Sequence, residues 1–265
     1  MTFIELFAIV GLIIFVLMTV LWLVSLVLRD SSIVDPFWGT GFVIASWVAF
    51  TLTPDGYPAR KWLLSTLVTL WGLRLSLYLL WRNWGKGEDF RYRKWREDHG
   101  AKWWWRSFFQ VFFLQGFLMW ILSAPLVATQ ASTQPTRLIW LDAIGIVIWM
   151  IGFFFEAAGD FQIARFKADP ANKGQVLRTG VWRYTRHPNY FGDATQWWGY
   201  FLIAAAAGAP WTIFSPILMT TLLARVSGVT LLERTLKETK PGYKEYVETT
   251  SAFIPWPPKK SSTTG

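Results

Sequence analysis

The sequence has no cysteine and only two histidines, His99 and His187. The lack of thiols excludes disulfides, thiolate catalysis and cysteine-based metal sites. Because the two histidines lie far apart in the sequence, a histidine-rich metal site is not expected, and we predict no metal. The chain also lacks the G-x-G-x-x-G pattern and any βαβ alternation, which excludes a Rossmann dinucleotide site.

Acidic residues are also scarce, since 17 aspartates and glutamates stand against 26 lysines and arginines, for a net charge of +9. A basic chain can bind nucleic acid, but these basic residues lie at the ends of apolar runs. Membrane topology explains that placement better, so we expect the lipid bilayer and no nucleic acid as a partner. With 53% hydrophobic residues, 19 tryptophans and 21 phenylalanines, the composition fits lipid-facing surfaces and interfacial aromatic belts.

Long apolar runs predict seven membrane-spanning helices. They cover residues 3–28, 38–54, 61–82, 108–129, 138–160, 194–208 and 211–230. A span needs roughly 20 apolar residues, so the short second and sixth runs are expected to be tilted, re-entrant or cavity-lining. The first run is too long for the core of a signal peptide, and we expect it to be retained.

Basic residues predict how these helices are oriented. With the N-terminus outside, the outer segments carry only Arg60, Lys61 and Arg137. The inner segments then carry one basic residue (Arg29), eight in 82–106, six in 165–186 and six in 234–260. This asymmetry predicts an all-α, multi-pass integral membrane protein with its N-terminus outside and its C-terminus in the cytoplasm.

We expect a single membrane domain over residues 1–258. The residues after the proline-rich stretch, 259–265, are expected to form a disordered cytoplasmic tail because they are polar and lack apolar side chains to bury. The chain is expected to be a monomer.

The third predicted helix carries an arginine inside an apolar span. A charged side chain at the centre of a bilayer costs at least about 2.5 kcal/mol on insertion scales, so Arg74 needs a partner or a function. Arg74, Tyr78 and Arg82 recur at four-residue spacing and therefore share one helix face. Two guanidiniums beside a phenol suit a phosphate-bearing ligand. The alternative is that Arg74 pairs with an intramembrane acid such as Glu156.

The fifth predicted helix ends with two carboxylates on one face. Glu156 and Asp160 are four residues apart, near the inner end of the helix. Like charges on one face repel each other, and carboxylates at membrane depth must face a cavity or pair with cations. A bound ligand with ribose hydroxyls or an amide could offset them, and so could Arg74 or Arg165.

Residues 180–198, with the sequence GVWRYTRHPNYFGDATQWW, combine cations, aromatics and one acid. Pro188 lacks an N–H and disfavours helical geometry for His187, which predicts a loop. This loop would feed an apolar helix that starts near Ala194, with Asp193 at its opening. A cationic, aromatic loop before a helix N-terminus suits an anion. The alternative is a positive-inside membrane flank with interfacial aromatics.

Two further segments allow a structural and a functional interpretation. Asp35 could cap the second helix, with Pro36 at its first position, or could be a buried carboxyl that faces a pocket. Residues 85–106 are expected to form a long inner loop whose mixed charges and tryptophans lie at the lipid headgroups. The fourth helix, in which Gln115 is one of two notable polar residues, is expected to be scaffold.

The pattern RYTRHPNYFGD, followed by WWGY, resembles the signature of DUF1295 membrane proteins, which are relatives of the steroid 5-alpha-reductases. Three other stretches resemble the same family in the same order: SSIVDPFWG (31–39), WGLRLSLYLLWRNWGKGEDFRYRKWR (71–96) and PGYKEYVETTSAFIPWPPK (241–259). The resemblance therefore covers nearly the whole chain. A similar RHP-N-Y core also occurs in isoprenylcysteine carboxyl methyltransferases.

The reductase resemblance implies NADPH as the cofactor and a C=C bond as the reacting group. It implies that Asp35 helps to hold the substrate carbonyl. The reductases have a catalytic tyrosine on the third helix, but Trp71 fills its position in this sequence. The resemblance therefore implies that Tyr78, from another turn of the same helix, takes the catalytic role. The implied cofactor-binding residues are Arg74, Arg82, Glu156, Asp160, Lys167, Arg178, Tyr184, Arg186, His187, Asn189, Asp193, Glu233 and Tyr246. The stretch Glu88-Asp89-x-Arg91-Tyr92, which recurs in the family, is expected to border the cofactor.

Three of these cofactor-binding positions depart from the reductase pattern. Glu156 stands where the reductases have an asparagine, and Asp193 stands where they have a glutamate. Glu233 stands in the region where the reductases have adjacent histidines.

These features together predict a membrane-embedded, NADPH-dependent reductase of a hydrophobic, lipid-like enone, with its cofactor site facing the cytoplasm. An alternative is an S-adenosylmethionine-dependent membrane methyltransferase, in which His187 would lie near the methyl donor. A third interpretation is a non-enzymatic lipid-binding protein, although ionisable groups inside a membrane usually serve a site. The expected location is the plasma membrane of a bacterium or the endoplasmic reticulum.

Overall fold

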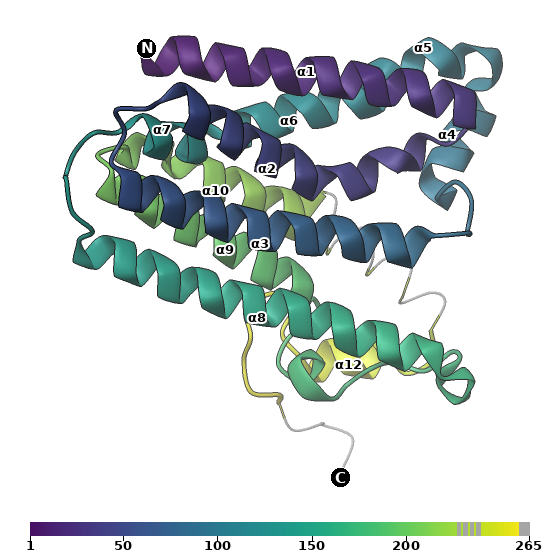
Figure 1. Cartoon of the computed structure of the whole chain (residues 1–265). Helices are drawn as coiled ribbons and strands as arrows, with labels where there is room; N and C mark the ends of the chain where they lie inside the picture. Colours follow the sequence, from purple (N-terminus) through teal and green to yellow (C-terminus); the bar gives the residue numbers. More distant parts are fainter. Residues whose placement is uncertain (227–228, 230–232, 234–235, 237–239, 260–265) are drawn as a thin grey trace. The chain divides into compact units, whose positions relative to one another are not determined.

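The computed structural model describes residues 1–226, 229, 233, 236 and 240–259. Every regular element in these residues is a helix, which confirms the all-α prediction (Figure 1). The chain divides into two compact units, Met1–Ile139 with Ile203–Thr212, and Trp140–Leu202 with Ile213–Gly265. The single domain over residues 1–258 stays a prediction.

The first unit is built on three long helices, α1 (Phe3–Leu28), α2 (Val34–Leu52) and α3 (Pro58–Asn83). Helix α1 begins with a capping box, in which Thr2 and Glu5 satisfy each other's backbone N–H groups. Helices α2 and α3 approach each other closely where Gly39 meets Gly72. A Cβ atom added to Gly39 would lie 2.2 Å from the carbonyl oxygen of Gly72, so only glycine fits this contact.

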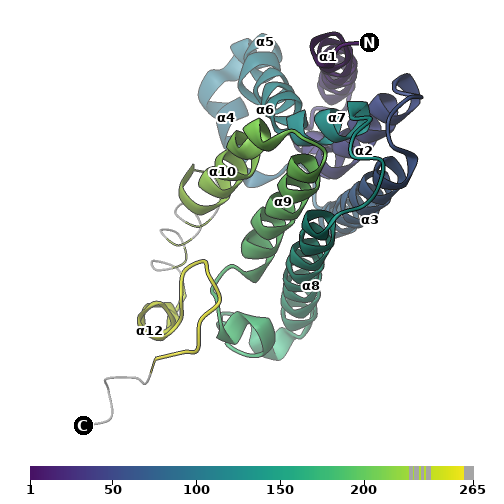
Figure 2. The ribbon, with the colours of Figure 1, turned by 90° about the vertical axis from the view of Figure 1, so that its left-hand side faces the viewer.

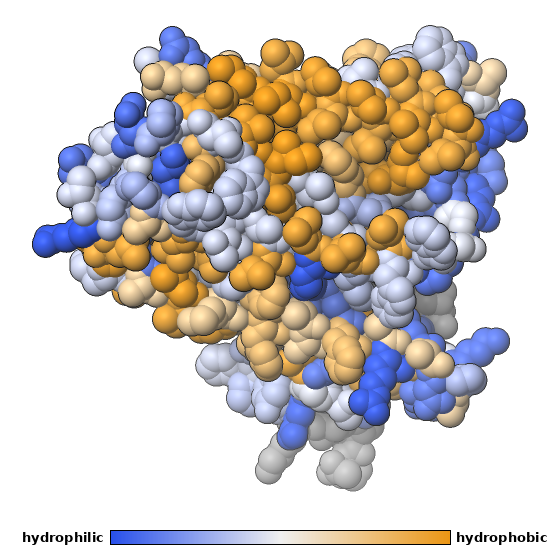
Figure 3. Space-filling model, in the orientation of Figure 1, coloured by the Kyte–Doolittle hydropathy of each residue, from blue (hydrophilic) through white to orange (hydrophobic). Residues whose placement is uncertain are grey.

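Apolar side chains cover the exposed face of α1, where Figure 3 shows a continuous hydrophobic surface. In the described part of the chain, four helical segments are long and apolar enough to cross a membrane, namely Phe3–Leu28, Ser31–Leu52, Pro58–Asn83 and Trp140–Ala168. A fifth span is present if the bent pair Phe90–Leu122 and Ala124–Ala131 counts as one. Helices of this kind indicate a protein that is embedded in a membrane.

The segment after α3 is helical, and the prediction of a long inner loop over residues 85–106 was wrong. Helix α4 (Phe90–His99), a 3₁₀ turn and α5 (Trp103–Ser107) occupy most of it. The side chain of Asp89 caps α4 by accepting a hydrogen bond from the backbone N–H of Arg91 at 3.0 Å. Four of the charges in this segment pair with one another, Arg91 with Asp89 and Arg96 with Glu88.

The fourth predicted helix, 108–129, is broken in the structure. A π-helical stretch (Phe108–Phe113) leads into α6 (Leu114–Leu122), and α7 (Ala124–Ala131) follows at an angle of 41°. Pro125 lies in the first turn of α7. Because proline has no N–H and its ring clashes with the preceding turn, it interrupts a continuous helix at this point.

The second unit contains α8 (Trp140–Ala168), most of α9 (Pro188–Ala206), α10 (Phe214–Thr221) with a π-helical stretch (Leu222–Val226), and α12 (Tyr243–Thr249). Helix α9 begins at Pro188, so the predicted start near Ala194 was wrong. Proline is well suited to the first turn of a helix, where its missing N–H would have no intrahelical partner. Asp193 therefore lies inside α9 and does not open it.

Glycines allow α8 and α9 to pack at close range. A Cβ atom on Gly152 would lie 2.6 Å from the carbonyl oxygen of Gly192, and one on Gly192 would lie 2.4 Å from the backbone nitrogen of Glu156. A Cβ on Gly199 would lie 2.8 Å from the carbonyl oxygen of Gly145. Small residues at such spacing let helix backbones approach each other in a membrane.

The C-terminal segment after α12 folds back along the loop that precedes α9 (Figure 2). The N–H of Arg186 donates to the carbonyl of Ser251 at 2.9 Å, and the N–H of Trp256 donates to that of Tyr184 at 2.9 Å. The N–H of Lys259 donates to the carbonyl of Thr249 at 2.8 Å. Lys259 is therefore held in place, and the rest of the predicted disordered tail, 260–265, lies outside the described residues.

The glycine contact between α8 and α9 leads to a prediction on stability. Gly192→Ala should lower the free energy of unfolding by about 1–3 kcal/mol, because its Cβ meets the backbone of α8 and the helices must move apart. The measurement is thermal unfolding in detergent. Gly116→Ala is the control, since the nearest neighbours of its Cβ would be side-chain atoms of Met18, at 3.0 Å, and Phe15, at 3.6 Å. Equal melting temperatures for the two variants would contradict the prediction.

Candidate functional site

Two buried carboxylates of α8 meet two amides of α9. The side chain of Asn189 donates from Nδ2 to Oδ1 of Asp160 at 3.3 Å, and Nε2 of Gln196 donates to Oε2 of Glu156. Glu156 and Asp160 are 2% and 6% exposed, so they are deeply buried. The structure thus places Asn189 beside Asp160 and Gln196 beside Glu156, and these amide donors help to offset the two carboxylates.

Gln196 was missed by the sequence analysis. It follows Asn189 by seven residues, or two helical turns, and this spacing could have placed it on the same face of α9. Its Oε1 atom is buried and has no hydrogen-bond partner among the described residues. A buried acceptor without a partner is costly, so this oxygen could accept a hydrogen bond from an amide or hydroxyl of a ligand.

Arg186, His187 and Glu233 form a second buried cluster. The Arg186 guanidinium donates from Nε to Oε1 of Glu233 at 2.7 Å, and Nε2 of His187 lies 3.3 Å from the same oxygen. Burial acts to raise the pKa of Glu233, but the hydrogen bonds from His187 and Arg186 outweigh it and lower the pKa to about 2. The carboxylate is therefore ionised. The imidazole also stacks on Tyr190, with ring centroids 5.6 Å apart.

Arg186 additionally ties the C-terminal segment to this cluster. Its Nη1 donates to the carbonyl oxygens of Val247, at 3.0 Å, and Thr250. Three protein acceptors thus engage a guanidinium that the sequence assigned to the cofactor. In this structure, Arg186 positions protein groups.

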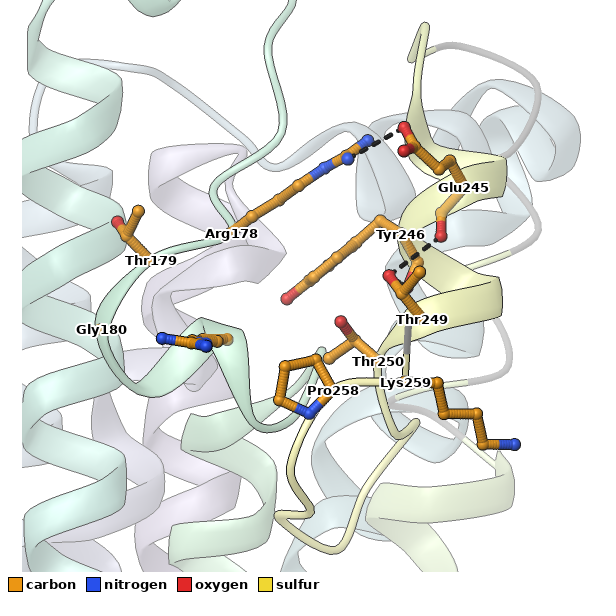
Figure 4. Close-up of a pocket in the computed structure, with 10 residues that line it drawn as sticks. Arg178, Thr179, Gly180, Glu245, Tyr246, Thr249, Thr250, Pro258 and Lys259 are labelled. Atoms are coloured by element: carbon orange, nitrogen blue, oxygen red, sulfur yellow. Dashed lines mark hydrogen bonds and ion pairs between the residues drawn. The ribbon is translucent and has the colours of Figure 1, made fainter. Parts of the chain in front are cut away.

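A cavity of about 510 Å³ lies between the loop at residues 178–183 and α12 with the segment after it (Figure 4). Arg178 extends across it and donates to Oε2 of Glu245 at 3.0 Å and to the carbonyl of Gly242 at 2.5 Å. The Arg178 guanidinium also lies 5.8 Å from the centre of the Tyr246 ring. Burial raises the pKa of Tyr246, and its hydroxyl donates to the carbonyl of Trp182. This phenol is therefore a fixed wall of the cavity.

Two predicted cofactor residues of the second unit lie outside the cavity beside α12. Lys167 is exposed in the last turn of α8, and Tyr184 is 42% exposed in the loop before α9. Neither lines the cavity.

In the first unit, Asp35 accepts two hydrogen bonds from α4. Tyr92 donates its hydroxyl to Oδ1 at 2.6 Å, and Arg91 donates from Nη2 to Oδ2 at 2.9 Å. The proposed capping role of Asp35 was wrong, because α2 begins before it at Val34. Asp30 caps the short 3₁₀ turn (Ser31–Ile33) that precedes α2.

Gln115 is a site residue that the sequence analysis did not identify, and the contact of Tyr92 with Asp35 was not predicted either. Nε2 of Gln115, which was assigned to scaffold, donates to the Tyr92 hydroxyl at 3.3 Å. The phenol is thus held between an amide donor and a carboxylate acceptor. Tyr92 is only 4% exposed. No local periodicity signals this contact, since Asp35 and Tyr92 are 57 residues apart.

Arg74, Tyr78 and Arg82 share one face of α3, as predicted. The guanidinium carbons of Arg74 and Arg82 lie 5.8 and 5.9 Å from the centre of the Tyr78 ring. Cations at this distance from a phenol ring are attracted by its π-electrons. The face therefore combines two positive charges with one aromatic ring.

A partly buried ion pair fixes the turn between α3 and α4. Glu88 accepts hydrogen bonds from Arg96 at 2.8 and 2.9 Å and from the backbone N–H of Ser31 at 2.7 Å. Burial acts to raise the pKa of Glu88, but these hydrogen bonds and the charge of Arg96 outweigh it and lower the pKa. The ion pair keeps α4 beside the start of α2, where Asp35 lies.

This ion pair predicts a pH-dependent stability. Since the pKa of Glu88 is lowered on folding from its ordinary value of 4.5, its stabilisation is present above pH 4.5 and is lost as the pH falls through the folded value. Arg96→Gln should therefore unfold at a lower temperature than the parent at pH 7, and the difference should shrink as the pH falls below 4.5.

Thermal unfolding in detergent at several pH values checks this, with Lys94→Gln as the control on an exposed face of α4. A difference between Arg96→Gln and the parent that stays constant with pH would contradict the role of Glu88.

Comparison with known proteins assigns the chain to a family. The family described as "Protein of unknown function (DUF1295)" matches residues 21–250, so the chain belongs to DUF1295. One similar protein is "Uncharacterized protein C594.04c" of Schizosaccharomyces pombe (strain 972 / ATCC 24843), at 28% identity over 279 residues. That match covers 93% of this chain and 79% of the yeast protein. No solved structure matches the chain.

Proposed function

With membership of the DUF1295 family as the premise, we propose that this protein is a membrane-embedded, NADPH-dependent oxidoreductase. It reduces a C=C bond of a lipid-like enone, of the kind found in a 3-oxo-4-ene steroid. The protein crosses the membrane seven times, with its N-terminus outside and its cofactor site facing the cytoplasm. It lies in a bacterial plasma membrane or in the endoplasmic reticulum.

The observation that best supports this proposal is the contact between Asp160 and Asn189. The resemblance to the steroid reductases assigns both residues to the nicotinamide cofactor. They are 29 residues apart in the sequence, yet their side chains meet at 3.3 Å on two neighbouring helices. The unsatisfied Oε1 of Gln196, next to Glu156 on the same helix pair, offers one more acceptor for an amide or a ribose hydroxyl.

In the proposed reaction, one set of residues holds the cofactor and another set acts on the substrate carbonyl. NADPH, when bound, would supply a hydride to the far carbon of the double bond, and a proton must then reach the carbon next to the carbonyl. Asp160, Asn189 and Gln196 would hold the polar groups of the cofactor. A polar donor near the substrate carbonyl must stabilise the negative charge that develops on its oxygen. Asp35 would fill this role in its protonated form, beside a phenol, either Tyr78 or the directly hydrogen-bonded Tyr92.

A second candidate function, an S-adenosylmethionine-dependent methyltransferase, is favoured by one contact. His187 and Glu233 lie 3.3 Å apart, and the resemblance to the isoprenylcysteine methyltransferases places both near the methyl donor. S-adenosylmethionine carries no phosphate, so this function would not use the cations of the inner segments as ligands.

Thermal unfolding of the detergent-purified protein with NADPH, NADH or S-adenosylmethionine distinguishes the two functions. A ligand at 100 times its dissociation constant stabilises the folded state by roughly 2.7 kcal/mol. We expect a higher melting temperature with NADPH. A shift with S-adenosylmethionine alone would replace the reductase by the methyltransferase, and no shift with any of the three would favour a lipid-binding protein.

The proposed cofactor residues predict the behaviour of two variants. Asp160→Ala and Asn189→Ala should each weaken NADPH binding at least about tenfold, because each removes a hydrogen-bonding group to the cofactor. Isothermal titration in detergent measures the affinity. Lys173→Ala is the control, since this exposed residue lies in the loop after α8. Parent-like NADPH affinity in both variants would place the cofactor elsewhere.

The proposed carbonyl site predicts a different effect. Asp35→Asn should lower kcat for enone reduction about 100-fold while leaving the affinity for NADPH unchanged, because the residue is proposed to contact the substrate oxygen and not the cofactor. NADPH oxidation with a panel of enones measures the rate. Comparing Tyr78→Phe with Tyr92→Phe then identifies the phenol. If all three variants keep the parent rate, the carbonyl is held by other groups.

A further inference from the structure

The cavity beside α12 carries positive charge that the described residues do not neutralise. Three cations line it, Arg178, Arg183 and Lys259, against a single acid, Glu245. Glu245 is already paired with Arg178 at 3.0 Å. The side chains of Arg183 and Lys259 are exposed and have no hydrogen-bond acceptor among the described residues. Two charged donor groups are thus left at the rim of a cavity of about 510 Å³.

We propose that this cavity binds a phosphate group, which Arg183 and Lys259 contact directly. A phosphate ester presents several strong acceptor oxygens and one or two negative charges, which match two cationic donors. Arg178 is a positioning residue here, since Glu245 and the carbonyl of Gly242 already engage its guanidinium. It adds positive potential to the cavity and holds α12 against the loop.

Lys259 reaches this cavity because the C-terminal segment is fixed to the protein. Its own N–H donates to the carbonyl of Thr249, and Trp256 is held by the carbonyl of Tyr184. Arg186 binds the carbonyl of Thr250, at the start of the segment. The segment therefore forms one wall of the phosphate site, with Pro258 and Lys259 among its residues, and Figure 4 shows the flexible side chain of Lys259 extending outward from this wall.

The phosphate can belong to a soluble nucleotide or to the headgroup of a membrane lipid. Both present the same oxygen atoms to Arg183 and Lys259. The site does not depend on the reductase proposal, because any phosphate ester of suitable size would bind to it.

The first experiment uses inorganic pyrophosphate as the probe and the full chain purified in detergent. We expect Arg183→Gln and Lys259→Gln each to weaken pyrophosphate binding about tenfold, and the double variant to weaken it further. Added salt should also weaken binding to the parent, because the contacts are charged and exposed. Lys244→Gln on α12, an exposed cation that does not line the cavity, is the matched control.

Both variants should fold normally, since neither side chain has a protein acceptor to lose among the described residues. Their melting temperatures without ligand should therefore equal that of Lys244→Gln. This comparison separates loss of binding from loss of folding.

Two further measurements distinguish the sources of the phosphate. If the ligand is a nucleotide, the two variants should weaken binding of NADPH about tenfold relative to Lys244→Gln. If it is a lipid, nanodiscs with phosphatidic acid should stabilise the parent more than nanodiscs with phosphatidylcholine, and the variants should lose this difference. Either outcome supports the site, and the lipid outcome does so even if NADPH does not bind.

Two results would overturn the proposal. One is equal affinity for pyrophosphate in Arg183→Gln, Lys259→Gln and Lys244→Gln. The other is that pyrophosphate, NADPH and phosphatidic acid all fail to stabilise the parent.

Discussion

Two carboxylates buried near the end of an apolar helix place the strongest constraint on the second unit. Glu156 and Asp160 lie in a segment of α8 that is apolar enough to cross a membrane, where an ionised group without donors is very costly. Gln196 and Asn189 of helix α9 supply these donors. The amides reach the carboxylates because Gly152 and Gly192 let the two backbones come together. The glycine contact is therefore part of the candidate site as well as part of the packing.

A second constraint comes from the guanidinium of Arg186. It lies buried beside Glu233, and its N–H groups donate to that carboxylate and to two carbonyls of the C-terminal region. Removing any of these acceptors would leave a buried charge with unmet donors. These hydrogen bonds thus order α12 and the segment after it, which line the cavity together with Arg178. The RHPN motif has two functions in this arrangement, since Arg186 orders the C-terminal wall and Asn189 reaches Asp160.

Local periodicity predicted part of this arrangement. The four-residue spacings of Glu156 with Asp160, and of Arg74 with Tyr78 and Arg82, placed each set on one helix face, and the structure agrees. Contacts between distant segments were not predictable in this way. The pairing of Asp35 with Tyr92 depends on how α4 packs beside the start of α2. The position of Lys259, the first residue of the predicted tail, was not predictable either, because it depends on backbone hydrogen bonds that leave no mark in composition.

The number of basic residues on the inner side could not show which of them meets a ligand. The positive-inside rule and a phosphate site both call for arginine and lysine in these segments, so a count of charges fits either equally well. The two explanations can be told apart by whether protein acceptors already occupy the N–H donors of each basic side chain. Arg186 lies three residues after Arg183, yet its guanidinium is engaged by the protein, whereas Arg183 meets no acceptor among the described residues. A charge that the fold leaves exposed at a cavity can bind a ligand without breaking an internal contact, and this selects Arg183 over Arg186.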